Sequence, residues 1–177
     1  MAVLATLPHP VQLVRSTSSY LLAPAPLADG VAFLTMPRAL GGPEFVARVT
    51  GDRLVVQRRS GTRTLVDSGC DTAADCTAVQ APVGDGVEVV YGIPADGGGG
   101  YIARAGVDGR SRLVAADERG DAPLAYAAAG GSTVYVLGGA ILGRTGTAAP
   151  VTLVKAGATG GDVRSVAATA AGVAWIA

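Results

Sequence analysis

The chain has 177 residues, fourteen basic and fourteen acidic side chains, and a formal net charge of zero at pH 7. A balanced charge argues against a general electrostatic attraction to nucleic acid or to an anionic membrane. Hydrophobic residues make up 49% of the chain and charged residues 16%, which excludes a disordered chain and allows one sizeable core. We therefore expect one folded domain, or a piece of a larger one, with no nucleic-acid partner.

The residue types favour strands and turns over helices. Lysine occurs once and glutamate three times, whereas the chain has 26 Gly and 10 Pro. Solvent-facing positions of helices are normally filled with Lys, Glu and Gln, because these side chains lose little freedom in a helix. Asp-Gly pairs, which are typical of tight turns, begin at Asp29, Asp85, Asp96 and Asp108. The composition predicts an all-β protein.

Short apolar runs bounded by turn residues recur along the chain and predict strands in groups of four. In chain order, residues 1–18 supply two strands, around 2–6 and 10–15. First strands of the following groups are expected at 21–23, 78–81, 124–128 and 166–169, and second strands at 30–34, 86–90, 133–137 and 172–176. Third strands are expected at 54–58, 101–105 and 140–144, and the fourth strand of each group holds a Leu-Val pair.

The Leu-Val pairs give these groups a common register. They begin at Leu13, Leu65, Leu113 and Leu153, and each is followed 18 to 22 residues later by the valine of the next second strand. The two N-terminal runs are echoed near the other end of the chain, 2–6 by 140–144 and 10–15 by 150–155. Self-similarity at this spacing is the signature of a repeat architecture.

Four short antiparallel strands every ~40–50 residues are typical of a β-propeller blade. On these repeats the chain resembles bacterial β-propeller repeat proteins of the TolB-like and related secreted kind, over essentially its whole length, although the Trp-Asp dipeptide of WD repeats is absent. The resemblance implies about four blades of four antiparallel strands. Residues 19–69, 77–117 and 122–157 would form three blades, and 1–18 and 163–177 would supply the last two and the first two strands of a composite blade.

Two arrangements remain open at this point. The terminal strands could pair and close a four-bladed ring, which leaves no exposed sheet edge. Alternatively, the chain is an arc of a larger propeller, in which case edge-to-edge self-association is expected.

An uncharged stretch, residues 122–143, has the length of a membrane span. It contains Pro123 and the glycine pairs at 130–131 and 138–139, so two strands around a turn explain it better. We expect no membrane span.

Cys70 and Cys76 enclose five residues in a turn-rich loop. We expect them to form a disulfide rather than two unpaired thiols, worth about 2 kcal/mol for so small a loop. A disulfide indicates an oxidising compartment, and hence an extracellular or cell-surface location in a bacterium. Residues 1–8 carry no basic segment and no long apolar run, so they do not form a secretory signal peptide.

Motifs for catalysis, metals and phosphate are not convincing. His9 is the only histidine and lies between two prolines, which is typical of an exposed turn. Asp67, Asp71 and Asp75 are four residues apart, a spacing that does not match a calcium loop. The glycines at 97–100 are not followed by Gly-Lys-Ser/Thr, so they do not form a phosphate-binding loop. We expect no catalytic residue, no metal and no cofactor.

In a propeller, the connections that follow the second and fourth strands emerge on one face. The longest of them are expected at 37–44, 68–77 and 94–100. Long loops on a rigid scaffold are where binding usually resides. Ligand contacts are therefore expected from the charged residues of these loops, namely Arg38, Glu44, Asp71, Asp75 and Asp96.

Two functions of different classes are compatible with these patterns. The first is a non-catalytic binding or scaffold propeller that presents the loop face to a protein or a glycan. The alternative is the propeller part of a hydrolase or lyase, with its active site at the channel mouth or in a companion domain. Enzymatic propellers usually place charged side chains at the ends of the first strands, which are almost devoid of them here. The sequence thus favours the binding function.

Overall fold

The computed structural model describes residues 19–37, 50–51, 53–58, 60–67, 79–94, 100–106, 108–117 and 125–177. Within these ranges the chain forms strands, turns and extended segments, and no helix. The all-β prediction is confirmed. The strands gather into three four-stranded antiparallel sheets, one hairpin and one short two-stranded ladder.

Sheet 1 is a meander whose strands pair in chain order: β1 (Ser19–Leu27), β2 (Gly30–Pro37), β4 (Arg53–Arg58) and β5 (Gly61–Asp67). The prolines at Pro24 and Pro26 fit because β1 is an edge strand and so has unpaired positions. A bulge between Leu22 and Ala25 shifts the register of β1 against β2, and Ala23 has a φ of 47° there. The strands of this sheet lie where the sequence predicts them.

Sheet 2 contains β7 (Val83–Gly84), β8 (Val89–Pro94), β9 (Gly100–Ala105) and β10 (Ser111–Asp117). The predicted second strand at 86–90 is wrong by three residues, because Val87 belongs to the preceding turn. Asp85 Oδ1 accepts hydrogen bonds from the backbone N of Val87 (3.0 Å) and of Glu88 (2.8 Å), which holds this segment out of the ladder. The strand expected at 78–81 is also divided, since β6 (Val79–Gln80) pairs with β3 (Thr50–Gly51) and β7 begins after Pro82.

Sheet 3 contains β11 (Tyr126–Ala129), β12 (Ser132–Leu137), β13 (Ala140–Thr145) and β14 (Val151–Val154). A further hairpin follows, formed by β15 (Ser165–Thr169) and β16 (Gly172–Ile176). Two-residue connections join β11 to β12 and β12 to β13, and all four of their glycines have positive φ, as the turn types that suit hairpins require. The predicted strands of this part of the chain are confirmed.

Three apolar cores lie between successive sheets, because alternate side chains of each strand point to opposite faces. The first joins β1, β2 and β4 of sheet 1 to β8 and β9 of sheet 2. The second joins the other face of sheet 2 to sheet 3 through Val90, Ile102, Val114 and Tyr135. The third joins sheet 3 to the hairpin through residues that include Val134 and Val166. The sheets are therefore stacked face to face in the order in which they occur in the chain.

An aromatic residue on the second strand of each unit points toward the preceding sheet. Tyr91 of β8 lies in the core shared with sheet 1, and Tyr135 of β12 in the core shared with sheet 2. Trp175 of β16 is the cross-strand partner of Val166, which faces sheet 3. Phe33 of β2 lies between Ala32 and Leu34, which face sheet 2, so it points away from sheet 2.

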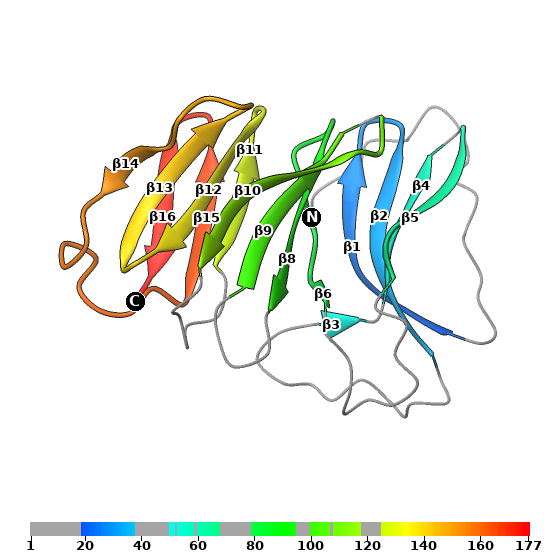
Figure 1. Cartoon of the computed structure of the whole chain (residues 1–177), viewed down its shortest axis with the longest axis horizontal. Coiled ribbons are helices and arrows are strands. Elements are labelled where there is room, and N and C mark those ends of the chain that lie inside the picture. The colour runs from blue at the N-terminus through cyan, green and yellow to red at the C-terminus, as the bar shows by residue number, and fades with distance from the viewer. Residues whose placement is uncertain are drawn as a thin grey trace, which may run out of the picture.

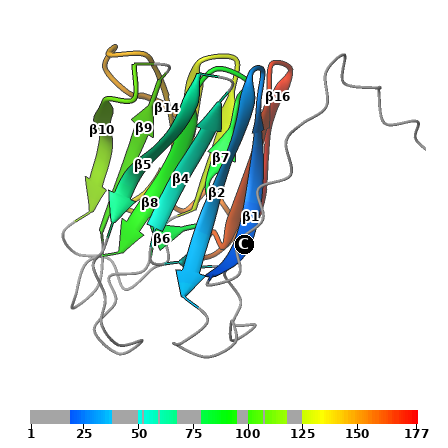
Figure 2. The same ribbon diagram turned by 90° about the vertical axis from the view of Figure 1, so that its right-hand side faces the viewer.

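The stack forms an open row in Figure 1, with sheet 1 at one end and sheet 3 with the hairpin at the other. In Figure 2 the first strands β1 and β7 lie toward one side of the stack, and the last strands β5 and β10 toward the other. The described sheets do not close into a ring, since no core joins sheet 1 to the hairpin.

Candidate functional site

The loop face was predicted from connections whose residues lie outside the described part of the chain. This holds for Arg38, Glu44, Asp71, Asp75 and Asp96, and equally for Cys70 and Cys76. The strands that lead into these connections are described: β2, β5 and β8 end at Pro37, Asp67 and Pro94. Their arrowheads lie at the same end of the molecule in Figure 2, where the sequence places the loop face.

A groove of about 420 Å³ opens between sheet 1 and sheet 2. Its lining comes from β5, β8, β9 and β10, namely Leu65, Val66, Tyr91, Ile93, Tyr101, Ala103, Ser111, Arg112 and Leu113. Tyr101 and Leu113 keep 40% and 59% of their surface exposed. Exposed large apolar side chains that line a concavity on a rigid scaffold are typical of a binding site.

The floor of the groove carries a hydrogen bond between two of its polar groups. The Tyr91 hydroxyl donates to Ser111 Oγ at 2.6 Å. Burial raises the pKa of the Tyr91 phenol, and the nearby Tyr101 adds to this effect, while the bond to Ser111 opposes it. Tyr91 is therefore a neutral hydrogen-bonding group at physiological pH.

One arginine, Arg112, lies among the lining residues of the groove, next to the turn that contains Asp108. Arg112 forms an exposed ion pair with Asp108 at 3.1 Å, and Arg63 of β5 donates to the backbone O of Asp108 at 3.0 Å. Arg110 donates its backbone N–H to the same aspartate, so its guanidinium is not used in that contact. Arg112 is 53% exposed beside Asp108, so this guanidinium can also approach an acidic group of a ligand.

The lining residues can bind a ligand but offer little for catalysis. The described lining residues include no carboxylate, imidazole or thiol, so there is neither a general acid–base pair nor an activated nucleophile among them. The groups that remain are phenol and serine hydroxyls, one guanidinium and apolar surface. Such groups can recognise an apolar or aromatic segment and orient it by a few hydrogen bonds.

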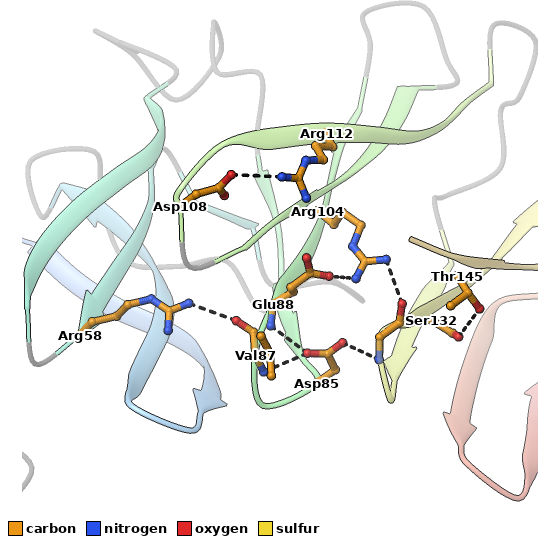
Figure 3. A network of polar contacts seen from close by, with 10 residues as sticks. Arg58, Asp85, Val87, Glu88, Arg104, Asp108, Arg112, Ser132 and Thr145 are labelled. Atoms are coloured by element: carbon orange, nitrogen blue, oxygen red, sulfur yellow. Dashed lines mark hydrogen bonds and ion pairs between the residues drawn. The ribbon is translucent and has the colours of Figure 1, made fainter. Parts of the chain in front are cut away.

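A second polar cluster lies among the connections between first and second strands, and it joins the sheets (Figure 3). Arg104 of β9 forms an ion pair with Glu88 and donates from Nη1 to the backbone O of Gly131 at 3.0 Å. Gly131 N in turn donates to Asp85 Oδ2 at 3.0 Å. These contacts connect sheet 2 to the β11–β12 turn of sheet 3.

Sheets 1 and 2 are linked in the same way. Arg58 of β4 forms an ion pair with Asp29. It also donates to the backbone O of Val87 at 3.1 Å, the contact drawn in Figure 3. The backbone N of Ala28 donates to Gly86 O at 2.6 Å. Because Arg104, Arg58 and the Ala28 N–H each donate to a backbone carbonyl of the neighbouring sheet, we assign this cluster to the positioning of sheets.

The described residues contain no group of three or more His, Cys, Asp or Glu side chains arranged to hold a metal ion. Within the same ranges, no helix has the length and apolar character needed to cross a membrane.

Comparison with known proteins does not assign the chain to a family. No protein-family model matches the sequence, and no curated protein matches it significantly. The function must therefore be inferred from the sheets and the groove.

The groove residues were not predicted from the sequence. Leu65 and Leu113 were used only as markers of the repeat, and Tyr91 falls one residue after the predicted second strand. One signal was available, because Leu113 is a large apolar residue next to the charged Arg112, and both Leu113 and Tyr101 lie on strands that were correctly placed. Since the groove forms only where two sheets meet, the sequence alone could not reveal that they share it.

Proposed function

We propose that the three sheets are blades of a β-propeller and that the chain forms an open arc of it. Three observations support this fold: the meander order of each sheet, the stacking of sheets in chain order, and a crowded first-strand side. There, a Cβ added to Gly84 of β7 would lie 2.4 Å from the carbonyl oxygen of Pro26 of β1. Such close approach of first strands is expected where blades converge on a common axis.

We further propose that the protein is a non-catalytic binding scaffold, exported or displayed at a bacterial surface. The observation that carries the binding function is the groove between sheets 1 and 2, whose lining includes the exposed Tyr101 and Leu113 and the guanidinium of Arg112. Of the two ligand classes considered, protein or glycan, the leucine and isoleucine lining favours a protein segment, because sugars present many hydroxyls that such side chains cannot satisfy. The exposed Arg112 guanidinium in the lining favours an acidic residue in that segment.

The test is a selection of peptides from a random library on the immobilised chain. Peptides with acidic and large apolar residues should be enriched, and Leu113→Ala should weaken the binding of the selected peptides at least ~10-fold, about 1.4 kcal/mol. Leu153→Ala is the matched control, since Leu153 is the corresponding Leu-Val leucine on the outer strand of sheet 3 and is also exposed, at 47%. Binding that is unchanged by Leu113→Ala, or an enriched pool without apolar residues, would contradict a groove ligand.

The same chain should be assayed with a panel of hydrolase and lyase substrates. Turnover that survives repurification would replace the scaffold function with the alternative, the propeller part of an enzyme. The predicted loop-face residues can be tested with the same selected peptides. Arg38→Ala and Asp96→Ala should weaken peptide binding only if the ligand also contacts these loops.

Export is supported by the expected disulfide between Cys70 and Cys76. The chain should be purified from the bacterial periplasm and treated with iodoacetamide before and after reduction. A disulfide requires that both thiols react only after reduction. Labelling of both cysteines without reductant would remove the support for an oxidising compartment.

A further inference from the structure

The strand registers define which residues of the three sheets correspond to one another. In each sheet the aromatic residue of the second strand pairs with one residue of the third strand, which in turn pairs with one residue of the fourth. These rows are Phe33–Val55–Thr64, Tyr91–Ala103–Leu113 and Tyr135–Leu142–Thr152. The residue directly after each row is the extra residue of a β-bulge, namely Leu65, Val114 and Leu153. The groove can therefore be compared, position by position, with the equivalent place between sheets 2 and 3.

Between sheets 2 and 3 the equivalent place is packed. Five lining residues of the groove, Leu65, Val66, Tyr91, Ile93 and Ala103, correspond to Val114, Ala115, Tyr135, Leu137 and Leu142. All five of these counterparts belong to one apolar core or pack against it. Arg144 also spans this interface, since its Nη1 donates to the backbone O of Val114 at 2.6 Å. The position of Arg144 is taken in sheet 2 by Ala105, which has no guanidinium to span the groove.

The floor of the groove is lower than its counterpart in sheet 3. Ala103 stands at the position of Leu142 and is the smallest residue of the lining. It is only 4% exposed, which places it at the bottom of the groove. The side chain of Leu142, in contrast, packs against the core between sheets 2 and 3.

The walls and the rim of the groove are higher than their counterparts. The corresponding pairs, with the groove residue first, are Leu65 and Val114, Val66 and Ala115, Tyr101 and Ala140, and Leu113 and Thr152. The groove residue has the larger side chain in every pair. Tyr101 and Leu113 stay 40% and 59% exposed at the rim. A low floor between high apolar walls is a shape that can receive an inserted side chain.

The charge beside this low floor also differs from sheet 3. Arg112 precedes Leu113 and pairs with Arg104, the residue next to Ala103 on β9. In sheet 3 the corresponding position is Val151, which is uncharged. The ion pair of Arg112 with Asp108 is exposed to solvent, so a ligand carboxylate can share this guanidinium at little cost. The charge of the lining is thus complementary to a negative group next to the inserted side chain.

We propose that the ligand of the groove is a peptide segment that inserts one leucine-sized aliphatic side chain over Ala103 and places a neighbouring carboxylate at Arg112. The inserted side chain takes the place that Leu142 fills in the packed interface. An aliphatic anchor is favoured over an aromatic one, because the fold itself fills the equivalent place with leucine. This inference rests on the proposed binding function and adds the residue that selects the anchor side chain.

The test uses peptides selected on the full chain, labelled with a fluorophore and titrated by anisotropy. Ala103→Leu raises the floor and should weaken their binding at least ~10-fold, and Ala103→Val should have an intermediate effect. Because Val55 and Leu142 stand at the equivalent position of sheets 1 and 3, the fold accepts both side chains there. The urea midpoint of the two variants should therefore not fall.

A change of the anchor in the peptide separates direct contact from an indirect effect. The unmodified chain should bind a peptide with the leucine replaced by alanine at least ~10-fold more weakly, whereas Ala103→Leu should bind the two peptides within about 2-fold. Replacement of the peptide carboxylate by its amide should weaken binding to the unmodified chain but not to Arg112→Met. Ala167→Leu is the matched control, since it adds the same side chain at an exposed strand position of the hairpin and should change neither affinity.

The outcomes separate this inference from the binding function. If peptide binding depends on Leu113 but is equally tight in Ala103→Leu, or if the shared anchor of the selected peptides is aromatic, the inserted leucine is wrong and the groove ligand stands. If no selected peptide depends on Leu113, the binding function and this inference fail together. If Ala103→Leu lowers the urea midpoint, Ala103→Val decides: a reduced preference for the leucine peptide supports the proposal, and an unchanged preference overturns it.

Discussion

Replacement of Arg104 by methionine tests how firmly the polar cluster holds sheet 2 to sheet 3. The side chain of Arg104 is 8% exposed and that of its partner Glu88 is 16% exposed. Arg104→Met keeps the apolar length of the side chain but leaves the Glu88 carboxylate buried without a counter-charge. Removal of one partner from a buried ion pair typically costs about 3–5 kcal/mol, most of it from the charge left behind.

A loss of about 4 kcal/mol is large for a domain of this size, whose total free energy of unfolding is expected to be about 5–15 kcal/mol. With a urea slope of about 2 kcal/mol per molar, the unfolding midpoint should fall by about 2 M. The double variant Arg104→Met/Glu88→Leu should recover most of this loss, because it removes both charges from the interior. Urea titrations of the two single variants and the double variant give the coupling energy.

The matched control is Arg112→Met, which breaks the ion pair with Asp108. These side chains are 53% and 42% exposed, so solvent screens the pair and the expected loss is below about 1 kcal/mol. If Arg104→Met costs no more than Arg112→Met, the buried pair does not hold the sheets together. If the double variant is as unstable as Arg104→Met, the uncompensated carboxylate is not the cause of the loss.

Three further predictions concern stability, each measured by denaturation. Gly84→Ala should destabilise the fold by about 1–3 kcal/mol, because the new Cβ meets the carbonyl oxygen of Pro26 at 2.4 Å. Gly172→Ala, with open space around its Cβ, should be neutral or slightly stabilising. Equal effects of the two substitutions would contradict close packing of the first strands. Thr133→Val should stabilise the fold by about 1 kcal/mol, since the buried Thr133 hydroxyl has no hydrogen-bond partner among the described residues. A decrease of similar size in the free energy of unfolding would instead show that the hydroxyl has a partner. Because burial raises the pKa of Tyr91 above its unfolded value near 10, the neutral phenol contributes stability that is fully present below pH ~10 and is lost as the pH rises through the folded pKa. Tyr91→Phe should make the alkaline loss of stability shallower, and an unchanged pH profile would show that another group causes it.

Most strand positions could be predicted from local patterns. The alternation of apolar residues and the turn glycines fix β12 and β13, for example, without reference to the rest of the chain. The start of β8 could not be predicted in this way. Asp85 accepts two backbone hydrogen bonds, which lengthens the turn, and a valine run alone does not show which of its members a side chain will hold outside the ladder.

The candidate site illustrates the same limit. Its floor depends on the bond between Tyr91 and Ser111, which are 20 residues apart on strands that are not neighbours in their sheet. Its other wall, Leu65 and Val66, comes from a different sheet. The charged residues predicted for the loop face lie outside the described ranges, so their role stays a prediction.

The sequence by itself determined that this chain is built from strands, where nearly all of them lie, and that they come in groups of four. Strand type and position follow from local alternation and turn chemistry, which are decided within about ten residues, and the grouping follows from similar segments that recur every ~40–50 residues. Only the tertiary structure decided which faces meet, which arginines cross between sheets, where a groove remains open and which edge is left unpaired. Those features arise when side chains from distant strands share one volume, and their distances depend on how the sheets stack rather than on the order of residues along any one strand.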